Sequence, residues 1–219
     1  MKAKKLFYIG ILLVALFVRW TVLVQTVDVQ AIGPNETEVG FASLNDRFHE
    51  WTGVHMALYV ITDWLGLVAI FCCMCLGGIG LIQLVKRKNL LKVDSDLLIL
   101  GIYYLTVIFG YLIFEMIPIN YRPILINGMI EASYPSSTTL LVLSVMPTII
   151  FQSKRRITNI FFRKCVIEFS FLFSVFMVIA RTVAGVHWLT DILGAIFLSA
   201  GLYLIYVSCV LFFDGKSKK

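Results

Sequence analysis

Six long apolar stretches constrain the fold of this chain more than any other feature of its sequence. They lie near residues 6–26, 56–85, 97–119, 136–151, 166–186 and 192–213. Most of them reach the roughly 20 residues that a helix needs to cross a bilayer. With 59% of its 219 residues hydrophobic and only 15% charged, the chain has more apolar side chains than one soluble core can bury. We therefore expect an all-α, polytopic membrane protein with six transmembrane helices in one bundle, forming a single domain over residues 1–219.

The fourth stretch is shorter than the others. Its 16 residues would span about 24 Å as a helix. We expect this helix to begin below the membrane surface, so that the turn at Pro135 lies near the depth of the lipid headgroups.

Basic residues divide unevenly between the two sides of this six-helix arrangement. Fifteen of the 19 Lys and Arg residues fall on the side that also holds both chain ends. The positive-inside rule then predicts cytoplasmic termini in a cell-membrane protein. The net charge of +6 is on this interpretation a topology signal, and it does not indicate a nucleic-acid partner.

Polar residues whose side chains could bind a ligand or take part in catalysis gather on the opposite, outer side. All fall within a few residues of the outer ends of the third to sixth helices; they are Arg122, Ser136, Ser137, Thr138, Arg181, His187 and Asp191. Charged groups at membrane depth are costly and usually functional or paired. Two arginines, a hydroxyl cluster that opens a helix, and a His with an Asp predict a phosphate site.

Each residue type suits that chemistry. Ser136 follows a proline turn and is expected to cap a helix, whose N-terminal N–H groups favour an anion. Arg122 and Arg181 can each grip phosphate oxygens through a planar fork of donors. His187 and Asp191 are four residues apart, so the carboxylate could hold one ring nitrogen protonated and leave the other free to attack phosphorus.

Three short motifs resemble the signatures of the type 2 phosphatidic acid phosphatases, a superfamily of membrane lipid phosphatases with bacterial members. The first and second resemble the end of Lys-x6-Arg-Pro and the start of Pro-Ser-Gly-His, and the third resembles that family's Arg-x5-His-x3-Asp. In this chain they are Asn120-Tyr121-Arg122-Pro123, Tyr134-Pro135-Ser136-Ser137 and Arg181-x5-His187-x3-Asp191. Their order, their spacing and the six-helix frame all match the family.

The resemblance implies a lipid phosphatase that works through a phosphohistidine without a metal or other cofactor. His187 would be the nucleophile and Asp191 its orienting partner. Arg122 and Arg181 would bind the phosphate, and groups of Ser136, Ser137 and Thr138 would complete the cradle. The partners implied are a lipid phosphate or diphosphate and the surrounding membrane lipids.

Two positions depart from the family pattern. Glu115 stands where the first signature has Lys, and Thr138 stands where the divergent second signature would have its His. That His normally protonates the leaving group, and general acid catalysis contributes about 10²–10⁴-fold. An alkoxide is as poor a leaving group as hydroxide and would suffer the whole loss, whereas a phosphate with a pKa of about 6 needs little help. We therefore favour a (poly)prenyl or other lipid diphosphate as substrate over a monoester.

Alternatives remain open at this stage. His49, His55 or Glu131 could replace the missing acid. The same fold could also serve a phosphotransferase that passes the phosphoryl group to an alcohol. A relative that binds anionic lipid without catalysis is the third interpretation, and the departures at Glu115 and Thr138 favour it.

Overall fold

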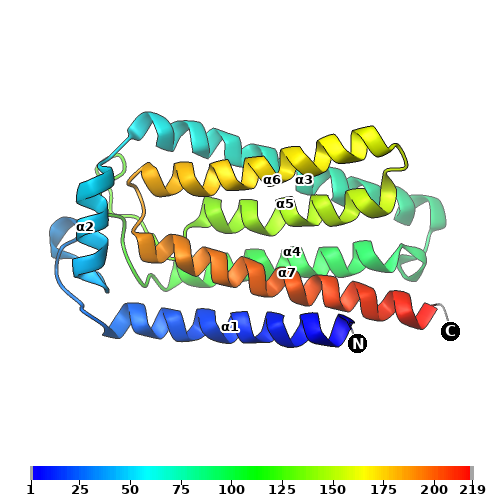
Figure 1. The fold of residues 1–219 in the computed structure, drawn as a ribbon, viewed down its shortest axis with the longest axis horizontal. Helices are drawn as coiled ribbons and strands as arrows, with labels where there is room; N and C mark the ends of the chain where they lie inside the picture. Colours follow the sequence, from blue (N-terminus) through cyan, green and yellow to red (C-terminus); the bar gives the residue numbers. More distant parts are fainter. Residues whose placement is uncertain (1, 218–219) are drawn as a thin grey trace.

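The computed structural model describes residues 2–217, in which seven α-helices and two short 3₁₀ helices are joined by loops with three isolated β-bridges. Six long helices lie side by side as a bundle, and the short α2 lies across one end of it (Figure 1). In chain order the elements are α1 (Lys2–Thr26), η1 (Pro34–Glu36), α2 (Ala42–Thr52), α3 (Met56–Arg87), η2 (Leu90–Lys92), α4 (Ser95–Met116), α5 (Ser137–Arg156), α6 (Ile160–Val183) and α7 (Leu189–Ser217).

Five of the six long helices are long and apolar enough to cross a membrane: α1, α3, α4, α6 and α7. They confirm an all-helical membrane fold, but not the expected count of six spans, because α5 does not meet that standard. The reason is its position between α3, α4, α6 and α7, which shield it from the exterior. A helix enclosed in this way can carry polar side chains that a lipid-facing helix cannot.

Neighbouring helices satisfy two of the polar side chains of α5. The hydroxyl of Tyr104 on α4 lies 2.6 Å from Thr148 Oγ1, and Gln152 Nε2 donates to the hydroxyl of Tyr206 on α7 at 2.8 Å. With 20 residues, α5 is longer than expected, since it continues to Arg156. Its first turn is set back from the neighbouring ends of α6 and α7 (Figure 1).

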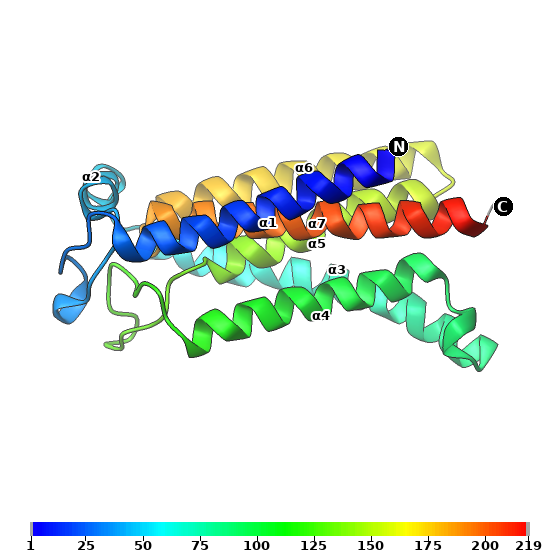
Figure 2. The same cartoon turned by 90° about the horizontal axis from the view of Figure 1, so that it is seen from below.

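Helices α1 and α7 run antiparallel and lie together in both views (Figures 1 and 2). Gly10 permits this close approach, because a Cβ atom there would lie 2.9 Å from the carbonyl oxygen of Gly201. Large apolar side chains on the outer faces of the bundle are exposed, which is the pattern of a protein solvated by lipid.

The polar segment between the first two apolar stretches, residues 27–55, contains a helix that the sequence did not indicate. Helix α2 is short and polar, so its pattern differs little from that of a loop. It is held through Asn45, which is buried and donates to Gly40 O at 2.8 Å and to Thr190 Oγ1 at 3.0 Å. The helix thereby braces the first turn of α7.

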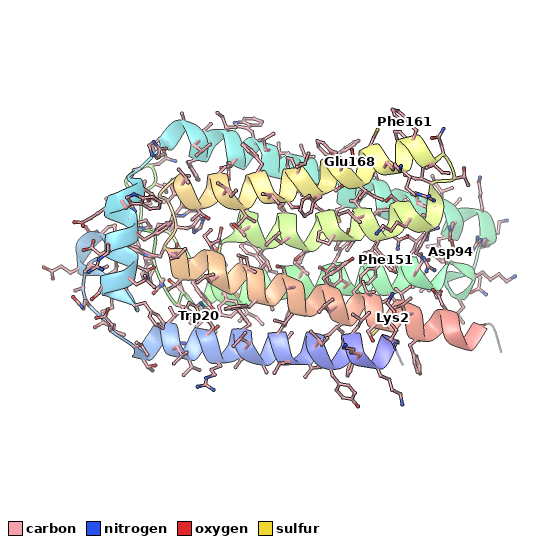
Figure 3. All side chains as sticks on the ribbon, viewed as in Figure 1. Lys2, Trp20, Asp94, Phe151, Phe161 and Glu168 are labelled. Atoms are coloured by element: carbon pink, nitrogen blue, oxygen red, sulfur yellow. The ribbon has the colours of Figure 1, made fainter. Side chains whose placement is uncertain are left out.

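The two ends of the bundle differ in their polar groups. Both termini lie at the end opposite α2, as Lys2 and Asp94 do in Figure 3, whereas Trp20 lies toward α2. At the terminal end, ion pairs join α5 to its neighbours: Arg155 to Asp96 at 3.0 Å and to Asp214 at 2.7 Å, and Arg156 to Asp96 at 2.8 Å.

Candidate functional site

The segment between α4 and α5 forms a small hairpin at the α2 end of the bundle. Its two arms are joined by bonds from Arg122 N to Glu131 O at 3.0 Å and from Ser133 N to Asn120 O at 2.9 Å. The hairpin therefore fixes Arg122 and Ser133 on facing arms. Tyr134 ties its end to α1, because its hydroxyl lies 2.8 Å from Thr21 Oγ1.

His187 lies in the tight turn between α6 and α7. Two residues before it, Gly185 has a φ of 68°, and a Cβ atom there would lie only 2.0 Å from the carbonyl oxygen of Gly53. Only glycine fits both the backbone angle and the contact. The amide of His55 also donates to Ala184 O at 3.0 Å. The turn is thus pinned against the start of α3, which fixes the backbone that carries His187.

The ring of His187 contacts Ser133 rather than Asp191. Its Nδ1 lies 3.1 Å from the carbonyl oxygen of Ser133 and 3.0 Å from Ser133 Oγ. The distance from Nδ1 to Asp191 Oδ2 is 3.9 Å, too long for a hydrogen bond. Ser133 Oγ donates to that same carboxylate oxygen at 2.5 Å. The direct contact expected between His187 and Asp191 is therefore replaced by a hydroxyl bridge.

Asp191 is fully buried and accepts two further hydrogen bonds. The backbone N–H of Trp188 donates to Oδ2 at 2.9 Å, and Asn120 Nδ2 donates to Oδ1 at 3.3 Å. The bond from Trp188 is a cap for the first turn of α7. Asp191 thus caps a helix and contacts the bridging hydroxyl at the same time.

These contacts determine which nitrogen of His187 is free. A backbone carbonyl oxygen can only accept, so Nδ1 carries the hydrogen and Nε2 keeps its lone pair. Burial lowers the pKa of His187 well below its usual 6.5, and the charges of Arg122 and Arg181 lower it further. The ring is therefore neutral at physiological pH, with Nε2 available as a nucleophile.

Arg181 lies beside that unprotonated nitrogen, and its Nη2 donates a long hydrogen bond of 3.5 Å to His187 Nε2. Only 1% of its surface is exposed. Its Nη1 donates to Thr62 Oγ1 at 3.2 Å and lies 3.8 Å from Asp63 Oδ1. Its Nε is buried and has no partner.

Arg122 is nine-tenths buried on the other side of the site. Its Nε lies 3.0 Å from Glu131 Oε2, which makes an ion pair by distance, although the N–H does not point at that oxygen. Its Nη1 is buried and has no partner. Unpaired buried donors are costly, so free N–H groups on two arginines are what a site for an anion requires.

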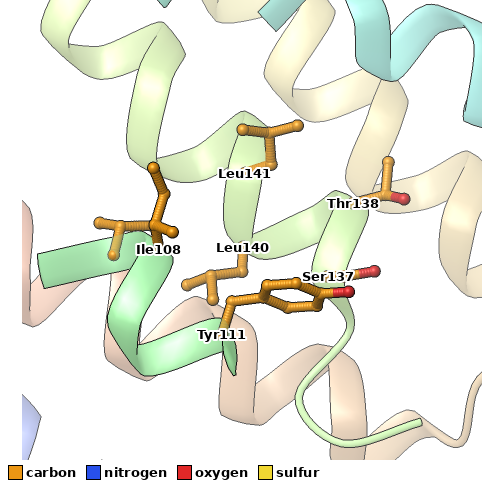
Figure 4. Close-up of a pocket in the computed structure, with 7 residues that line it drawn as sticks. Ile108, Tyr111, Ser137, Thr138, Leu140 and Leu141 are labelled. Carbon is orange, nitrogen blue, oxygen red and sulfur yellow. The ribbon is translucent and has the colours of Figure 1, made fainter. Parts of the chain in front are cut away.

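A polar cavity of about 270 Å³ lies between the end of α4, the hairpin and the start of α5. Arg122, Ser133, Ser137 and His187 line it, together with Tyr111, Phe114, Glu115, Glu131, Ala132, Tyr134 and Pro135. An apolar groove of about 210 Å³ adjoins it between α4 and α5, and Tyr111 and Ser137 line both spaces. Figure 4 shows these two residues at one end of the groove and Leu141 at the other.

Comparison with known proteins identifies the fold. No family model and no curated protein sequence matches the chain. Among solved structures, it matches the first transmembrane PAP2 type phosphatidylglycerolphosphate phosphatase, from Bacillus subtilis, with a TM-score of 0.61. The match covers 94% of this chain and 96% of that chain, at 21% sequence identity. The fold is that of a PAP2-type phosphatase.

The three hydroxyl residues that open α5 have different positions in this PAP2-type fold. Ser136 is the N-cap residue, but its side chain does not cap the helix; it is fully buried and donates to Thr139 Oγ1 at 3.0 Å. Ser137 lines the polar cavity, whereas Thr138 lines the apolar groove. Of the three, Ser137 alone is a wall residue of the cavity that contains His187.

Of the residues considered as replacement acids, some line the cavity and others do not. Glu131 lines the cavity, as does Glu115. The ring of His49 instead packs against Trp188, with 5.5 Å between centroids, and His55 Nε2 lies 2.9 Å from Thr52 O. Neither histidine lines the cavity.

Two residues of the site were missed by sequence reasoning. Ser133 bridges His187 and Asp191, and Tyr59 lies against both arginines, with its ring centroid 4.8 Å from the guanidinium carbon of Arg181 and 5.6 Å from that of Arg122. Tyr59 belongs to an apolar helix and carries no motif. Ser133 stands two residues before Pro135, but only the pairing of the hairpin arms places it beside His187.

Proposed function

We propose that the protein is an integral-membrane lipid phosphatase in which His187 is the nucleophile. The observation that carries this proposal is the free Nε2 of a neutral His187, beside Arg181 and in the wall of a cavity that Arg122 also lines. The PAP2-type fold and the three signature-like motifs support the same conclusion.

The reaction takes place in two steps. His187 Nε2 attacks the terminal phosphorus; the N–P bond forms while the bond from phosphorus to the leaving oxygen breaks, and that oxygen keeps the electron pair. Water then attacks the phosphohistidine, so that a P–O bond forms, the N–P pair returns to Nε2, and the proton of the water passes to solvent. Arg122 and Arg181 stabilise the charge on the phosphoryl oxygens in both steps.

The apolar groove supports a lipid substrate. It adjoins the polar cavity at Tyr111 and Ser137, which line both spaces, and most of its wall is formed by apolar residues of α4 and α5. A phosphate group in the cavity would place an attached hydrocarbon chain in the groove.

A lipid diphosphate, such as a (poly)prenyl diphosphate, fits the site better than a monoester. Thr138 has no acidic hydrogen to give an alkoxide, and its side chain lies along the groove. Glu131 is engaged by Arg122. A departing phosphate needs little protonation, so a diphosphate is compatible with a cavity in which His187 is the only imidazole.

The unequal distribution of basic residues between the two ends of the bundle supports one orientation of the protein in the membrane. The site lies at the end opposite both termini, and the basic residues of the sequence fall on the terminal side. We infer six spans, with α5 shielded by its neighbours, cytoplasmic termini and a site that faces the outer side of the cell membrane.

Phosphate release by purified protein in chelator tests the function. We expect farnesyl diphosphate to be hydrolysed at least tenfold faster than farnesyl monophosphate, which has the same hydrocarbon tail. We also expect His187→Ala to abolish release. Equal or faster turnover of the monophosphate would overturn the diphosphate preference, and an active His187→Ala would overturn the nucleophile.

A non-catalytic lipid-binding protein is the second candidate, favoured because Thr138, where the resembled family has its acid, lines the groove and not the cavity. It predicts saturable binding of the diphosphate without phosphate release in chelator. The phosphotransferase alternative predicts that an added acceptor alcohol becomes phosphorylated.

A further inference from the structure

We propose that the Ser133 hydroxyl is a positioning group through which Asp191 stabilises the Nδ1–H group of His187 and the positive charge that develops on the ring. This inference rests on the proposed role of His187 as nucleophile. It differs from a direct His–Asp pair, because the carboxylate and the ring do not form a hydrogen bond.

The hydrogen-bond inventory fixes the direction of the bridge. The carboxylate of Asp191 can only accept, so the one hydroxyl hydrogen of Ser133 points to Asp191 Oδ2. The lone pairs of Ser133 Oγ then face His187 Nδ1 at 3.0 Å and accept its hydrogen, together with the Ser133 carbonyl oxygen at 3.1 Å. One residue thus supplies both acceptors for Nδ1–H.

Ser133 is itself held firmly in place. It is buried, and its backbone N–H donates to Asn120 O across the hairpin at 2.9 Å. Asn120 also donates to the free oxygen of Asp191 at 3.3 Å. The hairpin therefore aligns the hydroxyl, the carboxylate and the ring as one network.

The bridge acts when charge develops on the ring. As Nε2 bonds to phosphorus, the imidazole becomes positive while Nδ1 keeps its hydrogen. Asp191 polarises the Ser133 hydroxyl, which makes Oγ a stronger acceptor for that hydrogen. No proton crosses the bridge, and the ring returns to neutral when water cleaves the N–P bond.

A purely structural role makes a different prediction. Asp191 caps α7, and Ser133 could merely satisfy its second oxygen lone pair. Loss of the hydroxyl would then lower thermal stability and leave the chemistry of His187 unchanged. The two roles are separated by measuring turnover and the Nδ1–H resonances of the ring as well as stability.

The experiment compares Ser133→Ala with Ser144→Ala in purified protein. Ser144 is an equally buried serine, on α5, whose hydroxyl has no partner, so this control removes a buried hydroxyl away from the site. We expect Ser133→Ala to lower kcat about 10–100-fold, the scale for groups that orient a catalytic histidine, with KM nearly unchanged. Ser133→Thr keeps the hydroxyl and should recover most of kcat.

A double-mutant cycle with Asp191→Asn tests whether Ser133 works through the carboxylate. If it does, the double variant is no slower than the slower of the single variants. Independent, multiplying effects on kcat would overturn the bridge. So would a kcat of Ser133→Ala equal to that of Ser144→Ala.

Nitrogen NMR tests the bridge without any turnover. The chain has three histidines, so replacing His49 and His55 by Gln leaves His187 as the one imidazole signal. The Ser133 carbonyl oxygen remains in Ser133→Ala, so we expect Nδ1 to carry its hydrogen in both proteins, with the Nδ1–H resonances shifted in the variant because the hydroxyl acceptor is lost. Unchanged Nδ1–H resonances overturn this inference even if the protein proves not to be a phosphatase, whereas an inactive parent with the expected resonances overturns the proposed function alone.

Discussion

The guanidinium group of Arg181 lies over the ring of Tyr59, 4.8 Å from its centroid, and Arg122 contacts the same ring at 5.6 Å. One aromatic side chain from α3 thus holds two cations of the site at the distance of cation–π contacts. Two arginines this close repel each other, and the ring offsets part of that repulsion. Arg181 Nε and Arg122 Nη1 stay without a partner and can donate to an anion.

We predict that Tyr59→Leu weakens substrate binding while Tyr59→Phe does not. Cation–π contacts contribute about 0.5–2 kcal/mol, so loss of the ring should raise KM about 2–30-fold. Phe keeps the ring and should stay within about twofold of the parent. Steady-state kinetics on a lipid diphosphate would check this, and equal KM values for the Leu and Phe variants would contradict it.

Filling the groove should affect long lipids selectively. Ile108 is exposed on the outer face of α4 and lines the groove, so Trp there would occupy the space without disturbing the core. We expect Ile108→Trp to raise KM for farnesyl diphosphate about tenfold, the loss of roughly two buried methylene groups. KM for a short, water-soluble diphosphate should not change.

The control for that experiment is Ile102→Trp. Ile102 lies on the same helix and is also exposed, but it does not line the groove. An equal rise of KM in both Trp variants, or for both substrates, would show that the groove does not hold the chain.

Restoring a general acid should change the substrate preference. Thr138→His puts an imidazole at the position where the resembled family has one, beside the cavity that contains His187. We expect monoester turnover to rise by about 10²-fold, within the range for general acids, and diphosphate turnover to change little. Turnover of matched farnesyl mono- and diphosphates measures both, and an equal gain on the two would refute the leaving-group argument.

Stability should decline as the solution becomes acidic. The pKa of His187 is about 6.5 in the unfolded chain and well below this in the folded protein, because burial disfavours its charged form. Below pH 6.5 the unfolded chain therefore binds more protons, and the free energy of unfolding falls by up to about 1.4 kcal/mol per pH unit.

Unfolding in detergent between pH 7.5 and 5 checks this for the parent and His187→Gln. The pKa of His49 is also lowered by burial, so the relevant quantity is the difference between the two proteins. That difference should shrink as the pH falls through 6.5. A difference that is constant over this range would mean that the buried ring charges freely.

The sequence predicts the long helices well and the bridging contacts poorly, for physical reasons. Side chains that face lipid must be apolar, so helices with a lipid-facing surface can be recognised from their apolar composition. Helix α5 faces other helices, and its polar residues make it less apolar than a lipid-facing span, so composition alone does not identify it as part of the membrane bundle. Ser133 and Tyr59 escape prediction because their function comes from partners distant in the chain. The signature-like residues Arg122, Arg181 and His187 are found by spacing, although spacing alone could not place Ser136 behind the cavity wall.

The enclosed position of α5 has a consequence for how the protein reaches its membrane. Two of the helices that shield it, α3 and α4, are synthesised before it, and the other two, α6 and α7, are synthesised after it. A segment with its polar side chains gains little by entering lipid alone. Its stable insertion therefore requires the last two helices. A chain that ends before α6 lacks two of the four helices that stabilise α5 in the membrane.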